Sequence, residues 1–176
     1  MTQHKRYVLT GSPGSGKTTL LQALKSEQIT CFEEVFRTLF LQAKDRGVNS
    51  PFQDEPLDLS EQIIKGRVAD FNSDAVSEIH IYDRGIHDAI AYLDGIQVEV
   101  PKHFIKICQS HIYDKVFILP PWEEIFANDQ ERIENFSETK SIHDELVNSY
   151  TTYGMPPIVV PKLSVEKRVS FIKDHL

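Results

Sequence analysis

The segment from Gly11 to Thr18 has the sequence GSPGSGKT, which satisfies the phosphate-binding pattern GxxxxGK followed by Ser or Thr. It follows a predicted strand and opens an amphipathic helical segment, so successive backbone N–H groups and a helix N-terminus would face one anion. Lys17 would reach the β- and γ-phosphates of a nucleotide, and the Thr18 hydroxyl would bind Mg²⁺. The alternative is a flexible turn rich in Gly and Ser. The predicted phosphate cradle consists of Ser12, Pro13, Gly14, Ser15, Gly16, Lys17, Thr18 and Thr19.

A second polar cluster, Asp83-Arg84-Gly85, follows an apolar run that is predicted to be a strand. In open α/β sheets, ligands bind beyond the carboxyl ends of the strands. If this strand lies beside the first one, Asp83 would lie next to the cradle and could hold Mg²⁺ directly or through water. Arg84 offers a planar fork that suits phosphate oxygens. The alternative for Asp83 is a residue that only initiates a turn before glycine.

Two further acids, Glu33 and Glu34, follow another predicted strand, and Arg37 comes shortly after them. A carboxylate at this place could accept the proton of an acceptor hydroxyl while Arg37 orients the acceptor. Acids are also favourable at any helix N-terminus, which is the alternative. The alternation of a strand points Phe32 and Glu34 the same way and favours Glu34, but the turn can break that alternation, so the choice between the two acids stays open.

The residues at about 122–137 are predicted to form a helical lid after the fourth strand. Such a lid could bring Arg132 onto the transferring phosphate, as an arginine finger does. The alternative is a solvated helix face with ordinary charge pairs. Trp122, at the start of this segment, is interpreted as a packing residue rather than a platform for a base.

Short β-branched or aromatic runs alternate with longer segments of helical period, which predicts βαβ units and a mostly parallel sheet. The whole chain, 1–176, is expected to form one domain, with a long loop over Gly47 to Pro56. The predicted strands are Arg6–Thr10, Ile29–Phe32, Ile79–Asp83, Lys115–Leu119 and Ile158–Val160. The predicted helices are Lys17–Ser26, Val35–Lys44, Leu59–Ala75, Ile86–Leu93, Lys102–Ser110, Ile125–Phe136, Thr139–Tyr153 and a last one after Ser164.

Composition narrows the classes of partner. The net charge of −7 disfavours a broad electrostatic grip on a nucleic acid polymer or an anionic membrane. No apolar run approaches the roughly 18 residues that a membrane span requires, and the expected location is cytoplasmic. Cys31 and Cys108 are too few for a disulfide scaffold and are interpreted as buried thiols.

These residues together resemble the P-loop kinase group, most closely the small "predicted ATPase" P-loop family related to the nicotinamide riboside kinase domain, and more distantly deoxynucleoside and nucleotide kinases. The resemblance covers nearly the whole chain. It rests on GSPGSGKTT at 11–19, FEEVFR at 32–37, IYDRG at 81–85, PPW at 120–122, NDQER at 128–132 and the tail from His143 through the predicted strand Ile158–Val160. It implies an α/β P-loop NTPase fold with a five-stranded parallel sheet, helices on both faces and the third strand beside the first. It also implies ATP with Mg²⁺ in the cradle and an acceptor near the end of the second strand.

Phosphoryl transfer from ATP to a small nucleoside, nucleotide or similar metabolite is the leading hypothesis, with Lys17, Asp83, Arg84 and Arg132 stabilising charge. The second hypothesis is a nucleotide-dependent binding switch that hydrolyses ATP slowly. The chain lacks the NKxD sequence of guanine-specific switches, and Arg84 stands where a hydrolysing motor would place Glu. The sequence leaves the acceptor, the choice between adenine and guanine, and the oligomeric state open.

Overall fold

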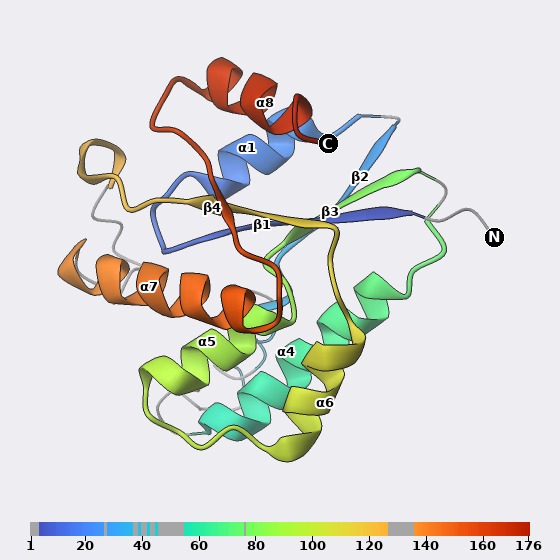
Figure 1. The fold of residues 1–176 in the computed structure, drawn as a ribbon, viewed down its shortest axis with the longest axis vertical. Helices are drawn as coiled ribbons and strands as arrows, with labels where there is room; N and C mark the ends of the chain where they lie inside the picture. The colour runs from blue at the N-terminus through green and yellow to red at the C-terminus, as the bar shows by residue number, and fades with distance from the viewer. Residues whose placement is uncertain are drawn as a thin grey trace.

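The computed structural model describes residues 4–26, 28–36, 39, 42, 45, 55–75, 77–126 and 136–176. Within them, five strands form one parallel sheet in the order β2-β3-β1-β4-β5 (Figure 1). The third strand lies beside the first, so the predicted α/β fold with a five-stranded parallel sheet is confirmed. The strands are β1 (Lys5–Gly11), β2 (Ile29–Phe32), β3 (Ile79–Asp83), β4 (Lys115–Leu119) and β5 (Ile158–Val159).

The register of the strands brings their carboxyl ends to one edge of the sheet. Leu9 of β1 pairs with Asp83, the last residue of β3. Gly11 pairs with the last residue of β4, and Phe32 at the end of β2 pairs with Tyr82. The chain segments that follow these strands therefore start close together, which is the condition for a shared site.

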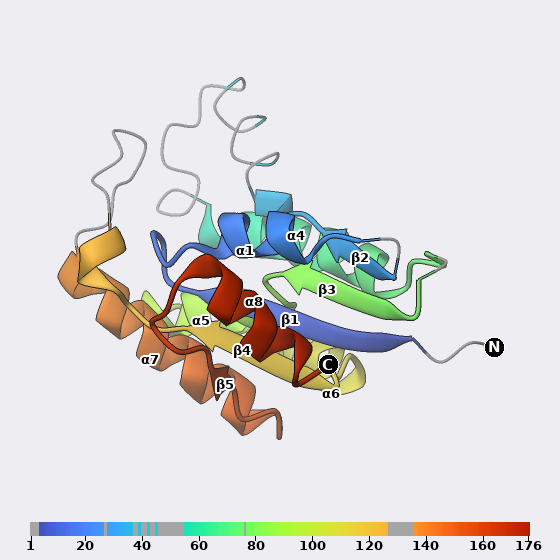
Figure 2. The ribbon, with the colours of Figure 1, turned by 90° about the horizontal axis from the view of Figure 1, so that it is seen from above.

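Helices cover both faces of the sheet. Helices α1 and α8 lie on one face, while α4, α5, α6 and α7 lie on the other (Figure 1). Figure 2 shows the strands fanning out in sheet order from β2 to β5. The helices are α1 (Lys17–Leu24), α4 (Pro56–Phe71), α5 (His87–Gly95), α6 (Lys102–Ser110), α7 (Phe136–Thr152) and α8 (Val165–Lys173), and a short 3₁₀ helix, η1, spans Glu123–Ile125.

Both faces of the sheet are buried because successive residues of each strand point to opposite helical layers. Leu9 packs with Leu20 of α1 and Ile172 of α8. Val8, its neighbour in β1, faces the other way and packs with Tyr150 of α7. Fully burying one such side chain stabilises the fold by about 1.5–3 kcal/mol. Apolar burial therefore holds the two helical layers against the strands that carry the site.

The predicted bounds of several helices are wrong by a few residues. Helix α5 ends at Gly95 rather than Leu93, and α7 begins at Phe136 rather than Thr139. The helix predicted over Leu59–Ala75 begins at Pro56 and ends at Phe71. Proline suits a first helical turn because its missing N–H would have no partner there, and the Asn, Ser and Asp that follow Phe71 favour turns. The helix predicted to reach Ser26 ends at Leu24, because Lys25 is extended and the next residue bridges to β2.

The helix predicted over Ile125–Phe136 does not begin at Ile125. That residue lies in η1, and Phe126 after it has extended backbone angles, φ −69° and ψ 93°. Residues 127–135 lie outside the described residues, as do most of the predicted helix Val35–Lys44 and of the predicted loop Gly47–Pro56.

The two cysteines are free thiols, Cys31 half-buried in β2 and Cys108 buried in α6. Among the described helices, none combines the length and the apolar character that crossing a membrane requires.

His87, the first residue of α5, is a fully buried histidine in the helical layer beneath the sheet. Its Nε2 lies 3.2 Å from the carbonyl oxygen of Cys108 and is assigned as the donor, and its ring contacts Tyr150 and Tyr153. Within the described residues its Nδ1 has no hydrogen-bond partner. Burial lowers the pKa of His87 from its ordinary value of 6.5 to about 4, although the Cys108 carbonyl acts in the opposite direction. The folded chain therefore holds this ring neutral.

This neutral ring predicts a loss of stability in acid. Below pH 6.5 His87 is protonated in the unfolded chain, but in the folded chain it stays neutral down to about pH 4. The free energy of unfolding should therefore fall as the pH falls through this window, by up to about 3 kcal/mol. Urea unfolding of the parent and of His87→Gln between pH 7 and pH 4 measures the slope. The variant should show the smaller slope. The exposed His103, replaced by Gln, serves as the control, and equal slopes for all three proteins would contradict the prediction.

Candidate active site

The loop between β1 and α1 has the backbone that the glycine pattern predicts. Gly16, at φ 90°, is the N-cap of α1 and provides no side-chain cap, so the first N–H groups of the helix face a potential ligand. Gly11 has φ 148°, and a Cβ there would lie 2.7 Å from the carbonyl oxygen of Leu119. Only glycine allows β1 to pass so close to β4 as the chain turns into the loop.

The Lys17 side chain lies folded over this loop and is buried. Its Nζ donates to the carbonyl oxygens of Gly11, at 2.7 Å, and of Ser12, at 3.0 Å. Burial, and after it the positive charge of Arg84, lower the pKa of Lys17 to about 7. Lys17 is therefore a desolvated amine at the N-terminus of α1, a position where a bound anion is favoured.

The remaining predicted cradle residues lie on the loop and the first turn of α1. Ser12 and Ser15 are buried, Pro13 and Gly14 are half-buried, and Thr18 and Thr19 are exposed. Their roles in binding phosphate and Mg²⁺ stay predictions.

An ion pair joins the ends of β2 and β3 at the mouth of this loop. Arg84 Nε donates to Glu34 Oε1 at 2.6 Å, and its Nη1 donates to the Gly11 carbonyl oxygen at 3.2 Å. Arg84 has φ 69°, a conformation that costs a non-glycine residue on the order of 1–3 kcal/mol and persists only where its surroundings impose it. This backbone conformation directs the Arg84 side chain from the end of β3 toward Glu34 and the loop after β1.

The two candidate acids after β2 differ sharply. Glu34 is mostly buried, with 28% of its side chain exposed, whereas Glu33 is 85% exposed and pairs with Lys25 at 3.3 Å. Burial alone would raise the pKa of Glu34, but Arg84 and Lys17 more than offset it, so the pKa is lowered and the carboxylate is ionised at neutral pH. The structure thus brings Glu34, and not Glu33, to the phosphate loop, the segment 12–16 between β1 and α1.

Asp83 ends β3 beside the loop and is buried. Burial raises the pKa of Asp83 to about 6, against the lowering effect of Arg84. Its Oδ1 has no hydrogen-bond partner within the described residues, so one hard oxygen remains available, as Mg²⁺ prefers. The described residues contain no cluster of three or more His, Cys, Asp or Glu that could hold a metal ion. A carboxylate and a hydroxyl oxygen are donors that Mg²⁺ accepts, so Asp83 and Thr18 stay the predicted Mg²⁺ ligands.

Asp88 in the first turn of α5 is a site residue that the sequence analysis missed. It accepts hydrogen bonds from the hydroxyls of Thr10, at 2.5 Å, and Tyr150, and from the Gly85 N–H at 3.0 Å. It also lies 3.5 Å from Arg84 Nη1. These bonds fix the turn that carries Arg84. The i,i+4 spacing of Arg84 and Asp88 was the available signal, but β1 and α7 supply the other partners.

Two predicted arginines are not placed by the structure. Arg132 and Arg37 lie outside the described residues, so the arginine-finger role of Arg132, the acceptor-orienting role of Arg37 and the helical lid stay predictions.

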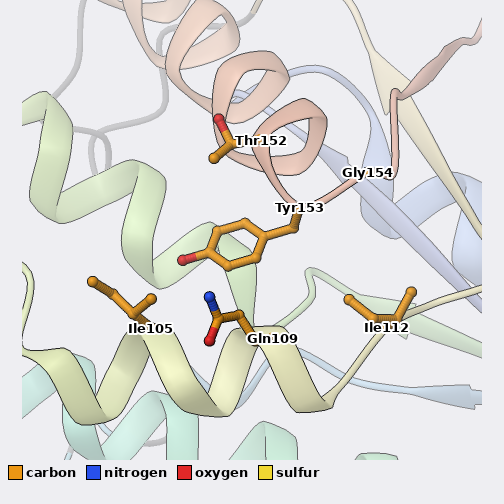
Figure 3. Close-up of a pocket in the computed structure, with 6 residues that line it drawn as sticks. All are labelled: Ile105, Gln109, Ile112, Thr152, Tyr153 and Gly154. Atoms are coloured by element: carbon orange, nitrogen blue, oxygen red, sulfur yellow. The ribbon is translucent and has the colours of Figure 1, made fainter.

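A pocket between α6 and α7 lies apart from the phosphate loop (Figure 3). It has a volume of about 470 Å³ and contains a single ionisable side chain, the phenol of Tyr153, which points into it (Figure 3). Ile112 in its wall precedes the start of β4, so the pocket lies at the opposite edge of the sheet from the loop after β1. It is lined by Ile105, Gln109, Ile112, Thr152, Tyr153 and Gly154.

Comparison with known families identifies this arrangement. A family model described as an AAA domain matches residues 6–168, which include the whole sheet except Lys5, and the loop after β1. The chain belongs to this AAA-domain family. No curated protein matches the chain. Membership of the AAA-domain family agrees with the strand order and confirms the predicted P-loop resemblance.

Three solved structures of known proteins have a similar fold. NadR in complex with NR has a TM-score of 0.71 and 17% identity. The match covers 98% of this chain but only 50% of the NadR chain, so this chain spans about half the length of NadR. Deoxyadenosine kinase from M. mycoides with bound dATP has a TM-score of 0.68 and 15% identity, with 98% of both chains covered. Thymidylate kinase from Ehrlichia chaffeensis has a TM-score of 0.63 and 19% identity, again with 98% of both covered. At these identities the likeness shows the P-loop kinase-like fold alone.

Proposed function

We propose that this AAA-domain protein is an ATP-dependent kinase that transfers the γ-phosphate to a hydroxyl group of a small acceptor of the nucleoside class. The observation that carries the proposal is the Glu34–Arg84 pair, an ionised carboxylate held by a charge-assisted hydrogen bond at the mouth of the phosphate loop. A hydroxyl acceptor must lose a proton as it attacks phosphorus, and Glu34 is a base positioned to take it.

The same carboxylate disfavours a phosphate acceptor. A phosphate oxygen is already anionic, needs no base, and would be repelled by Glu34. Two like charges 4 Å apart in a partly buried site repel by about 4 kcal/mol. A nucleoside hydroxyl therefore suits this site better than the phosphate of a nucleotide.

The phosphate loop would bind the donor. Lys17 would exchange the loop carbonyls for the β- and γ-phosphate oxygens, and Arg84 Nη1 lies against the same loop. Asp83 and Thr18 would hold Mg²⁺, which supplies charge neutralisation to the phosphates. Arg84 keeps the Glu34 carboxylate ionised and oriented, and Asp88 keeps Arg84 in place. Transfer of this kind depends mostly on positioning and electrostatics. Structural likeness to a deoxyadenosine kinase and to NadR in complex with NR supports the proposal by analogy.

The test is acceptor-dependent transfer. The purified protein is incubated with γ-labelled ATP, Mg²⁺ and a panel of nucleosides, including nicotinamide riboside, each paired with its 5′-monophosphate. We expect label on at least one nucleoside and little on the matching monophosphate. Transfer to monophosphates alone would refute the proposed role of Glu34. Hydrolysis of ATP without any transfer would favour a nucleotide-dependent switch instead.

A further inference from the structure

Arg168 is a buried arginine of α8 that lies against the outer side of the phosphate loop. Only 5% of its surface is exposed. Its Nη1 is 3.5 Å from the carbonyl oxygen of Ser15, and a Cβ built on Gly16 would lie 3.2 Å from the same nitrogen. Figure 2 shows α8 running across the same face of the sheet as α1, the helix that the loop opens.

The described residues around Arg168 include no carboxylate that balances its charge. Within the described residues no carboxylate forms an ion pair with it, and its Nε has no hydrogen-bond partner. Its guanidinium carbon lies 5.4 Å from the centre of the Trp122 ring, whose π face is a weak substitute for an anion. A buried charge is costly unless it is compensated. Within the described residues, the carbonyl oxygen of Ser15 is the one hydrogen-bond acceptor of this cation.

The Ser15 carbonyl and the Gly16 N–H are the two polar groups of one peptide unit. The described residues contain no cis peptide bond, so the Ser15 oxygen and the Gly16 N–H point to opposite sides of this peptide. Arg168 lies on the oxygen side, and the N–H points away from α8. A cation near the carbonyl polarises the peptide and makes its N–H a stronger donor, because linked hydrogen bonds reinforce one another.

We propose that Arg168 is a positioning residue for phosphate binding: it orients and polarises the Ser15–Gly16 peptide so that the Gly16 N–H donates to a phosphate of the bound nucleotide. The role does not require contact between Arg168 and the nucleotide. It rests on the proposed function only in that the loop binds nucleotide phosphates.

The test combines three variants and two probes. Arg168→Met removes the charge and keeps an apolar stem against Trp122, Arg168→Lys restores a charge, and Lys167→Met removes a charge from the exposed neighbouring position as the control. Calorimetry measures the affinity of each protein for ATP and for inorganic tripolyphosphate, both with Mg²⁺. We expect Arg168→Met to weaken both affinities about tenfold, Arg168→Lys to recover part of the loss, and Lys167→Met to match the parent.

An amide spectrum adds a readout whose direction depends on the charge of Arg168. In ¹H–¹⁵N correlation spectra without nucleotide, the Gly16 amide proton should shift upfield in Arg168→Met and stay in place in Lys167→Met, because only the first change removes the polarising charge. If Arg168→Met does not fold, Arg168→Gln takes its place in both measurements.

The outcomes separate this inference from the proposed function. Loss of affinity for ATP but not for tripolyphosphate would overturn the inference, because Arg168 would then act on the base or sugar. Unchanged affinities with an unmoved Gly16 amide would also overturn it and leave Arg168 as a packing residue. A parent protein that binds neither probe would refute the proposed nucleotide site, and the inference with it.

Discussion

Replacing Glu34 by glutamine should lower the rate of phosphoryl transfer about 10²- to 10⁴-fold and leave the ATP dissociation constant nearly unchanged. The amide keeps the shape of the side chain and can still accept a hydrogen bond from Arg84, so the turn after β3 should hold. It cannot take a proton from an acceptor hydroxyl. Single-turnover transfer to the best acceptor of the panel, measured with an independent titration of ATP binding, separates the two effects.

The neighbouring acid provides the matched control. Glu33 is exposed and, among the described residues, forms an ion pair only with Lys25, so Glu33→Gln should transfer phosphate like the parent. If the two variants lose activity equally, the effect is a general change of charge near β2. If both transfer like the parent, the acceptor site does not lie at the end of this strand.

Replacing Lys17 by alanine should reduce transfer by at least about 10²- to 10³-fold and weaken ATP binding, because the ammonium group is the charge that the loop offers to the β- and γ-phosphates. The fold should survive the change. The pKa of Lys17 is lowered to about 7, which means that the folded chain holds this buried ammonium at a cost. That cost offsets part of the stability lost with its hydrogen bonds to the Gly11 and Ser12 carbonyls, so a melting curve should show a folded protein.

Lys25→Ala is the control for this experiment. Lys25 lies just after the same helix and is exposed. Its side chain forms a surface ion pair with Glu33, the one that the described residues show, and such a pair contributes little. Its loss should leave ATP affinity, transfer and melting temperature close to those of the parent. Unchanged ATP affinity and turnover in a folded Lys17→Ala protein would remove the basis for placing the nucleotide at this loop.

The sequence alone predicts the elements of this fold well, because the signals are local. Apolar runs of five or so residues predict β1, β3 and β4 nearly to the residue, and the glycine pattern predicts the turn that opens α1. The bounds fail where a local signal is weak. The proline that starts α4 also suits a loop, and nothing in the sequence marks the extended backbone at Phe126.

In the candidate site, too, residues marked by a local sequence signal could be predicted and residues that depend on tertiary packing could not. The positions of Lys17, Thr18 and Asp83 around the loop after β1 could be predicted, because each is fixed by its place directly after a strand or in a short motif. Glu33 and Glu34 could not be separated, since the turn after β2 decides which of them reaches Arg84. Asp88 went unnoticed, because an acid in the first turn of a helix is favourable anywhere and carries no sign of its partners.

The local chemistry follows from the sequence: a glycine-rich GxxxxGKT loop between a strand and a helix, and polar residues at the ends of parallel strands. Which of these residues meet depends on the fold. Arg84 and Glu34 are 50 positions apart, and Arg168 and Ser15 are 153 apart. Such pairs depend on sheet order and on the packing of helices against it, and apolar burial, which has no direction, drives that packing without leaving a signature at the polar residues it brings together.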